Sequence, residues 1–117
     1  MKLLSNTDNE ILNTLIILAE NMENGWNEND YVKFSKDQTD EFRKQVDIHE
    51  FNKQRNDAYG QLGSHEIIDF VTLHKNPDNI IIIWKMKFEK RDEHGLAIYY
   101  FKEINDKAVI SGAMFHA

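Results

Sequence analysis

The residues of this chain that could carry out acid–base chemistry lie mostly in its second half. Moving a proton next to a carbonyl group requires a carboxylate base that faces a hydrogen-bond donor able to hold the enolate oxygen. Asp69 is the candidate base, with Tyr100 and His116 as candidate donors and His74 as a further polar neighbour. Successive side chains of a regular strand point to opposite faces, so odd-numbered Asp69 would lie on the other face from these even-numbered donors. This conflict favours a noncatalytic protein.

Other common catalytic and metal-binding patterns are not found in the sequence. The chain has no cysteine, which excludes disulfides, cysteine-based zinc sites and cysteine nucleophiles. His49 and Glu50 are not followed by a second histidine at the spacing of a zinc protease, because Lys53 occupies that position. Gly-rich phosphate loops and the Gly-x-Ser-x-Gly elbow are also missing. We therefore expect no metal ion and no cofactor.

Length and charge restrict the partners of the protein. A chain of 117 residues is long enough for a single domain with its own core. It carries 20 acidic and 14 basic side chains, for a net charge of −6, whereas nonspecific nucleic-acid binding depends on an excess of lysine and arginine. The apolar runs are too short to span a membrane, and the polar N-terminal segment does not resemble a signal peptide. We expect a cytoplasmic protein that binds neither nucleic acid nor membrane.

The first half of the chain, about residues 6–62, has helical patterns. A cap at one of residues 6–8 precedes apolar residues that recur about every four positions, namely Ile11, Leu15, Leu18, Met22 and Trp26. A short helix is predicted over residues 31–34. Residues 38–62 predict two helical pieces, because Asp47 and Glu50 have the spacing of a capping box and indicate a new start near Ile48.

The second half, about residues 64–117, changes to the two-residue period of strands. The segment Asn76-Pro77-Asp78-Asn79 predicts a turn, residues 91–95 predict a second, and Asn105-Asp106 a third. Gly112 interrupts the last strand and predicts a bulge there. The expected architecture is therefore an α+β domain, in which N-terminal helices pack on a curved, four-stranded antiparallel sheet.

Both faces of the expected sheet are apolar, because even and odd positions alike carry large hydrophobic side chains. A monomer rarely exposes such a surface, so we expect a homodimer formed through one sheet face. The expected dimer face consists of the odd-numbered residues Val71, Ile81, Ile83, Tyr99, Phe101, Val109 and Phe115. An alternative is that bulges shift the alternation and mix the two faces. In a further alternative, this face binds a different protein.

Several segments together resemble a known superfamily. A long capped helix precedes the turn from Gly25 to Tyr31, and the segment Asn29–Ser35 leads into a further helix that ends at Gly60-Gln61-Leu62-Gly63. With the following meander, this order is similar to the nuclear transport factor 2-like, cystatin-like superfamily, and in particular to its small bacterial members of uncharacterised function. The resemblance implies a cone-shaped half-barrel over residues 1–117, with a pocket between helices and sheet, in a homodimer.

The function expected from these features is noncatalytic binding of a small hydrophobic ligand or a partner segment in the pocket. We expect the pocket to be lined by Trp26, Tyr59, Phe70, His74, Trp84, Met86, Tyr100 and Met114. The resemblance leaves open an enzyme of the isomerase, dehydratase or cyclase type that uses a pocket tyrosine, histidine and aspartate. A third alternative is an interaction subunit that uses the open sheet face. Fold analogy does not choose among these three.

Overall fold

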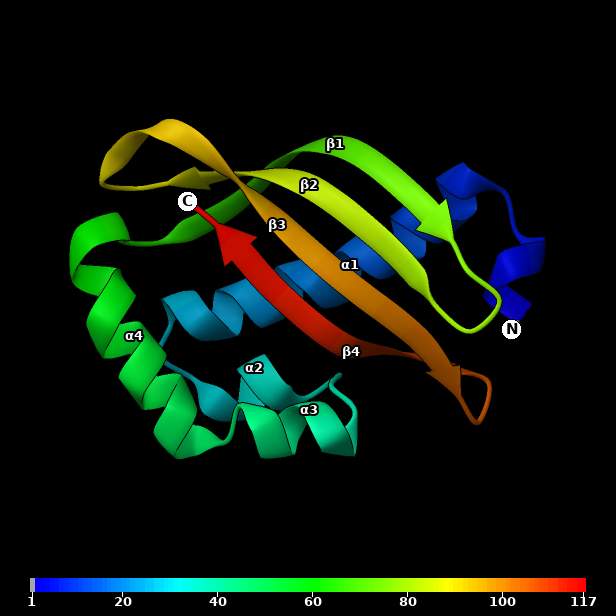
Figure 1. Cartoon of the computed structure of the whole chain (residues 1–117), viewed down its shortest axis with the longest axis horizontal. Coiled ribbons are helices and arrows are strands. Elements are labelled where there is room, and N and C mark those ends of the chain that lie inside the picture. Colours follow the sequence, from blue (N-terminus) through cyan, green and yellow to red (C-terminus); the bar gives the residue numbers. More distant parts are fainter. Residues whose placement is uncertain (1) are drawn as a thin grey trace.

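The computed structural model describes residues 2–117, and it confirms the expected α+β class. A helical half is followed by a four-stranded sheet (Figure 1). The elements are a short 3₁₀ helix η1 (Lys2–Ser5), the helices α1 (Asp8–Asn27), α2 (Tyr31–Ser35), α3 (Asp40–Gln45) and α4 (Ile48–Leu62), and the strands β1 (His65–Lys75), β2 (Ile80–Phe88), β3 (Arg91–Ile104) and β4 (Lys107–His116). None of the helices within these residues is long and apolar enough to cross a membrane.

Helix α1 begins where the sequence predicts. The Glu10 backbone N–H donates to Thr7 Oγ1 (3.2 Å), and the Thr7 backbone N–H donates to the Glu10 carboxylate (2.9 Å). Hydrogen bonding of the Thr7 backbone and side chain to the Glu10 carboxylate holds the pKa of Glu10 below its usual value. The buried face of α1 consists of Ile11, Leu15, Ala19, Met22, Gly25 and Trp26. The predicted apolar stripe is thus confirmed, except that Leu18 is only half-buried.

The break between α3 and α4 is also confirmed. Asp47 caps α4, because its carboxylate accepts a hydrogen bond from the Glu50 backbone N–H (2.9 Å). The Glu50 side chain does not close the second half of the box but accepts from Gln54 (3.1 Å). A single carboxylate cap is sufficient to start a new helix here.

The sheet is an antiparallel meander in the order β1-β2-β3-β4. The turn predicted at residues 91–95 is wrong, because the chain already reverses at Glu89-Lys90 and Arg91 pairs with Phe88. Gly95 lies within β3 rather than in a turn, at a point of close packing. A Cβ atom there would lie 2.8 Å from the Phe88 ring, so only glycine allows this close approach.

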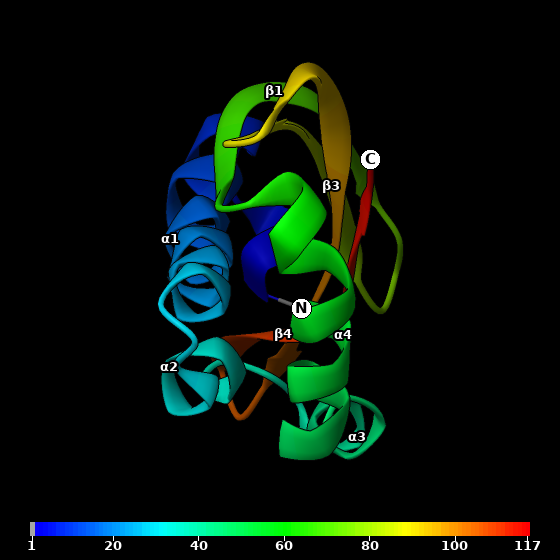
Figure 2. The ribbon, with the colours of Figure 1, turned by 90° about the vertical axis from the view of Figure 1, so that its left-hand side faces the viewer.

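The helices cover one face of the sheet, which we call the inner face. In Figure 2 helix α1 lies on one side and the sheet on the other, with α4 in front of the space between them. The opposite, outer face is turned to the viewer in Figure 1. The edge of β4 is partly covered, because Ile110 exchanges backbone hydrogen bonds with Asp37 (2.7 Å) and Thr39 (2.9 Å).

Irregular pairing decides which side chains reach the inner face. Strand β1 carries extra residues at Ile68 and Val71, and β4 carries one at Ser111, beside Gly112. The bulge predicted at Gly112 is therefore confirmed, and each such insertion reverses the alternation of side chains along a strand. Neighbouring strands also differ in parity, since Ile82 in β2 pairs with Tyr99 in β3.

Candidate functional site

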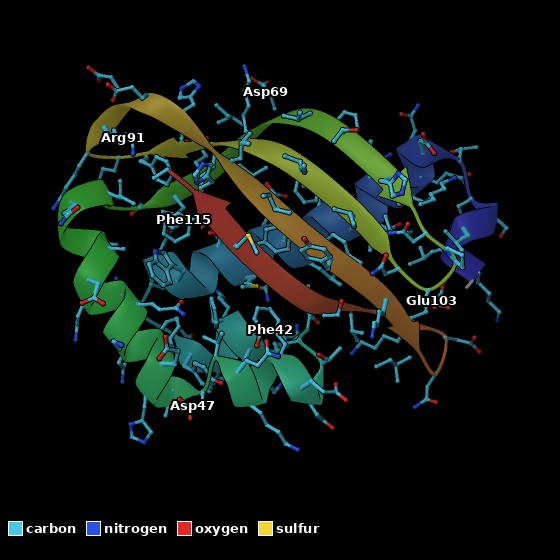
Figure 3. All side chains as sticks on the ribbon, in the orientation of Figure 1. Phe42, Asp47, Asp69, Arg91, Glu103 and Phe115 are labelled. Atoms are coloured by element: carbon cyan, nitrogen blue, oxygen red, sulfur yellow. The ribbon has the colours of Figure 1, made fainter. Side chains whose placement is uncertain are left out.

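A cavity of about 250 Å³ lies on the helix side of the sheet. Its walls come from α1, α2, the α3–α4 region, the start of β1 and the end of β4. The lining residues are Met22, Glu23, Trp26, Phe34, Phe42, Val46, Gln54, His65, Ala113, Met114 and Phe115. Two of them, Phe42 from α3 and Phe115 from β4, are labelled in Figure 3. The lining is mainly aromatic and aliphatic, as in most small-molecule sites.

Three polar side chains in contact with one another, Tyr99, Glu23 and His65, lead from the core to this cavity. Glu23 Oε1 lies 3.0 Å from His65 Nδ1, and the Tyr99 hydroxyl donates to Glu23 Oε2. The His65 side chain is 2% exposed and that of Glu23 is 13% exposed. A carboxylate can only accept hydrogen bonds, so the proton of the neutral imidazole lies on Nδ1. The lone pair of His65 is consequently on Nε2.

Tyr99 keeps its proton in this arrangement. Its side chain is fully buried, and burial raises the pKa of its hydroxyl well above the usual value, with the negative charge of Glu23 adding to the shift. The hydroxyl therefore remains a donor to Glu23 at all ordinary pH values. Both oxygens of the buried carboxylate thus have a donor.

Two polar atoms on residues of the cavity wall are buried without a hydrogen-bond partner among residues 2–117. They are Trp26 Nε1 and His65 Nε2. The two rings stack with centroids 5.2 Å apart and planes 23° apart. A third such atom is Oε1 of Gln38, whose amide nitrogen donates to Phe34 O (3.0 Å). Burying a polar group without a partner costs about 1–3 kcal/mol, so a site holding two such atoms is suited to a ligand that satisfies them.

Neighbouring polar residues fix the positions of Trp26 and His65. Asn27, the last residue of α1, accepts from the His65 backbone N–H (2.8 Å) and donates to the His65 carbonyl (2.8 Å). Arg55 of α4 donates to the carbonyls of Trp26 (2.8 Å) and Asn27 (3.1 Å), and its guanidinium lies 4.0 Å from the Tyr59 ring centroid. Helix α1, helix α4 and strand β1 are therefore tied together beside the cavity.

The structure places the candidate catalytic residues on the outer face. Asp69 pairs with Lys85, which pairs with Leu96, which in turn pairs with His116, so these residues form one row across the sheet. Tyr100 pairs with Ile81 in another row of this face. Figure 3 shows Asp69 projecting from the margin of the molecule. The expected separation of Asp69 from Tyr100 and His116 is wrong, because the bulge at Ile68 reverses the alternation in β1, but none of the three lines the cavity.

Two of the eight residues expected in the pocket, Trp26 and Met114, border the cavity, although the pairing of Met114 with Ile98 turns its side chain toward the outer face. The other six lie elsewhere: Trp84 and Met86 in the core, Tyr59 beneath Arg55, His74 and Tyr100 on the outer face, and Phe70 exposed on the edge strand β1, paired with Trp84. These positions differ from the prediction because Trp84 and Met86 are covered by the helices and β1 is irregular.

The expected dimer face mixes residues of both sheet faces. Tyr99 and Phe101 are fully buried against the helices, and Phe115 lines the cavity, so their assignment to a dimer face is wrong. The physical reason is the opposite parity of paired residues in β2 and β3. Val71 is exposed at its bulge, Val109 pairs with the exposed Lys102, and Ile81 and Ile83 do lie on the outer face. The apolar centre of the outer face is formed by Ile81, Ile83, Leu96, Ile98, Tyr100 and Met114.

Sequence reasoning missed the two ionisable residues among those that line the cavity, Glu23 and His65. One signal was available, because Glu23 lies four residues after Ala19 and three before Trp26. This spacing places a carboxylate on the apolar face of the helix, where it needs a partner. No pattern in the sequence indicated that His65 lies at the cavity, because its position depends on contacts with Glu23 and Asn27 of α1.

Comparison with known proteins gives a likeness of fold. No family model matches the chain, and no curated protein matches it. Among solved structures, it is similar to one described as the structure of Bdellovibrio bacteriovorus Bd1075, with a TM-score of 0.56 and 11% sequence identity. The match covers 91% of this chain and 40% of that chain. At this identity the likeness concerns the arrangement of helices and strands alone.

Proposed function

We propose that this protein binds a small hydrophobic molecule, without catalysing a reaction, in the cavity lined by α1, α3, α4 and the end of β4. The observation that carries the proposal is an apolar cavity whose wall contains buried polar atoms without partners, on Trp26 and His65. Polar groups of this kind orient a ligand, while the apolar wall supplies most of the affinity.

The size and lining of the cavity suit a single aromatic ring with a short chain. A cavity of about 150 Å³ can hold benzene, and pockets for drug-sized ligands begin at about 300 Å³. The volume here, about 250 Å³, lies between these values. Phe34, Phe42, Phe115 and Trp26 offer ring faces and edges to an aromatic ligand.

The order of elements supports a second part of the proposal, membership of the nuclear transport factor 2-like superfamily. Helices that precede a curved meander, with a cavity between them, are the features that such membership implies. The outer face supports a third part, a homodimer that buries this apolar surface. Its central row, Ile83, Ile98 and Met114, would lie against the same row of a second copy, as in a two-fold symmetric interface.

The ligand proposal is tested by isothermal titration calorimetry with 3-phenylpropanol. We expect a dissociation constant below about 1 mM for the natural protein. Replacement of Ala113, a lining residue of β4, by phenylalanine should fill the cavity and abolish the heat of binding. The control, Val109→Phe, adds the same ring on the outer side of the same strand and should leave binding unchanged. An unchanged affinity in Ala113→Phe would place the ligand elsewhere.

A second candidate function, an acid–base enzyme, is favoured by one observation, the contact of Glu23 with His65. An imidazole held by a carboxylate is a common general base. The distinguishing measurement is exchange of the protons next to the carbonyl of 4-phenyl-2-butanone with deuterated water. The binding protein that we propose produces no exchange above the buffer rate, whereas an enzyme accelerates it and loses the acceleration in His65→Gln.

A further inference from the structure

The two unpartnered atoms of the cavity wall differ in what they can do. Trp26 Nε1–H can only donate a hydrogen bond, whereas His65 Nε2 accepts when the imidazole is neutral and donates when it is protonated. A ligand group that satisfies both must therefore accept from the indole and either donate to the neutral imidazole or accept from the protonated one. A carboxyl group meets both demands, because one oxygen accepts while the other releases or shares its proton.

The surroundings of His65 supply one charged partner for an imidazolium, the Glu23 carboxylate. Glu23 holds Nδ1–H from behind, with Tyr99 on its other oxygen. Three aromatic rings surround the imidazole, with centroid distances of 5.2 Å to Trp26, 5.2 Å to Phe88 and 4.7 Å to Phe115. A carboxylate in contact with an imidazolium stabilises it.

The charged groups on the other side of His65 are solvent-exposed. Glu66, Lys87 and Glu89 border a second hollow, of about 460 Å³, which His65 also lines, and they carry charges of both signs. Their effects on the imidazole are screened by water, so Glu23 is the dominant charged neighbour. The imidazolium also separates Glu23 from the ligand carboxylate, which limits repulsion between the two anions.

From this arrangement we infer that the ligand is a small aryl carboxylic acid, bound as its carboxylate between the Trp26 indole N–H and a protonated His65. The inference rests on the proposed function, since it specifies the ligand class of the same cavity. At neutral pH the free acid is already ionised, so binding takes one proton from the solvent to form the Nε2–H bond of His65. No other bond forms or breaks.

The test is calorimetry with 3-phenylpropionate and 3-phenylpropanol at neutral pH, in two buffers of different ionisation enthalpy. The natural protein should bind the acid about tenfold or more tightly than the alcohol, as expected for a charge-assisted hydrogen bond. The buffer dependence of the heat should show uptake of about one proton for the acid and none for the alcohol. This comparison needs no variant, so it stands even where a substitution harms folding.

Two substitutions localise the effect. His65→Gln should remove proton uptake and weaken binding of the acid about tenfold or more, while the alcohol keeps its affinity within about threefold. Trp26→Phe removes the indole N–H and keeps an aromatic ring, and it should reduce the preference for the acid without removing proton uptake. The control, His49→Gln, changes an exposed histidine of α4 and should change neither value. Thermal melting followed by circular dichroism checks that each variant is folded.

The outcomes separate the inference from the function on which it rests. Binding of the alcohol with no preference for the acid would overturn the inference and leave the ligand-binding function intact. Tight binding of the acid without proton uptake, or with uptake retained in a folded His65→Gln, would also overturn it. Failure of both probes to bind would overturn the inference and the proposed function together.

Discussion

The side chain of Asn27 holds the backbone of His65 in the way that a neighbouring strand would. Its Oδ1 accepts from the His65 N–H and its Nδ2 donates to the His65 carbonyl, both at 2.8 Å. The end of α1 thereby satisfies both backbone groups of the first residue of β1. The same helix end carries Trp26, so the two residues that give the cavity wall its unpartnered atoms are fixed relative to each other.

Loss of this contact should weaken the fold. Asn27→Ala leaves the part-buried N–H and C=O groups of His65 without their partner, and we expect the free energy of unfolding to fall by about 1–3 kcal/mol. Urea denaturation measures the change. Asn27→Asp is the matched variant, because it keeps the acceptor for the N–H and loses the donor to the carbonyl, and it should also be destabilising. A loss below about 0.5 kcal/mol in the alanine variant, within the range of an ordinary surface substitution, would show that the contact is not important.

The raised pKa of Tyr99 predicts a change of stability at alkaline pH. The unfolded tyrosine ionises near pH 10, whereas the folded one keeps its proton, so the contribution of Tyr99 is complete below that pH and is lost as pH rises above it. The free energy of unfolding should fall by as much as about 1.4 kcal/mol per pH unit in this range from Tyr99 alone. Tyr99→Phe should remove that slope in urea denaturation series. Tyr31, whose pKa is also raised, contributes equally to both proteins. Equal slopes in the two proteins would refute the prediction.

A pair of glycines tests the packing of α1 against α2. A Cβ atom on Gly25 would lie 2.6 Å from Phe34 Cα, so Gly25→Ala must push the two helices apart at the cavity wall. We expect a loss of about 1–3 kcal/mol from overpacking. Gly60, in α4, has no atom within 4 Å of the same position, so Gly60→Ala should be neutral or stabilise the protein by up to about 1 kcal/mol. Similar effects of the two substitutions on the melting temperature would contradict this packing.

The proposed homodimer predicts a clear effect of charge on the outer face. Ile98 lies in the central row between Ile83 and Met114, so Ile98→Glu would bury a carboxylate in the interface and should convert the dimer to a monomer at micromolar concentrations. Analytical ultracentrifugation measures the change. The control, Val32→Glu, alters an 80% exposed residue of α2 and should leave the dimer intact. A natural protein that sediments as a monomer would rule out this interface.

The helical half was predictable because its signals are local. Thr7 and Asp47 cap helices through residues three positions away, and the stripe from Ile11 to Trp26 reflects the period of one helix. Gly112 likewise marked a local irregularity. These features depend on neighbours in sequence, so the sequence alone is sufficient to locate them.

The faces of the sheet and the site could not be predicted in the same way. Side-chain direction depends on register, and the insertions at Ile68 and Val71 reverse it twice within β1. The site depends on contacts between distant segments, since Glu23 meets His65 from 42 residues away and Tyr99 from 76 residues away. Such contacts are set by the packing of α1 on the sheet, which no local pattern describes.

The central claim, that the cavity between helices and sheet binds the ligand, is tested most directly by nuclear Overhauser effects between bound 3-phenylpropionate and the protein. The claim predicts contacts from the aromatic protons of the probe to the methyl groups of Met22 and Ala113, which line the cavity from α1 and β4. Contacts instead to the methyl groups of Ile83 and Ile98 would place the ligand on the outer face and contradict the claim.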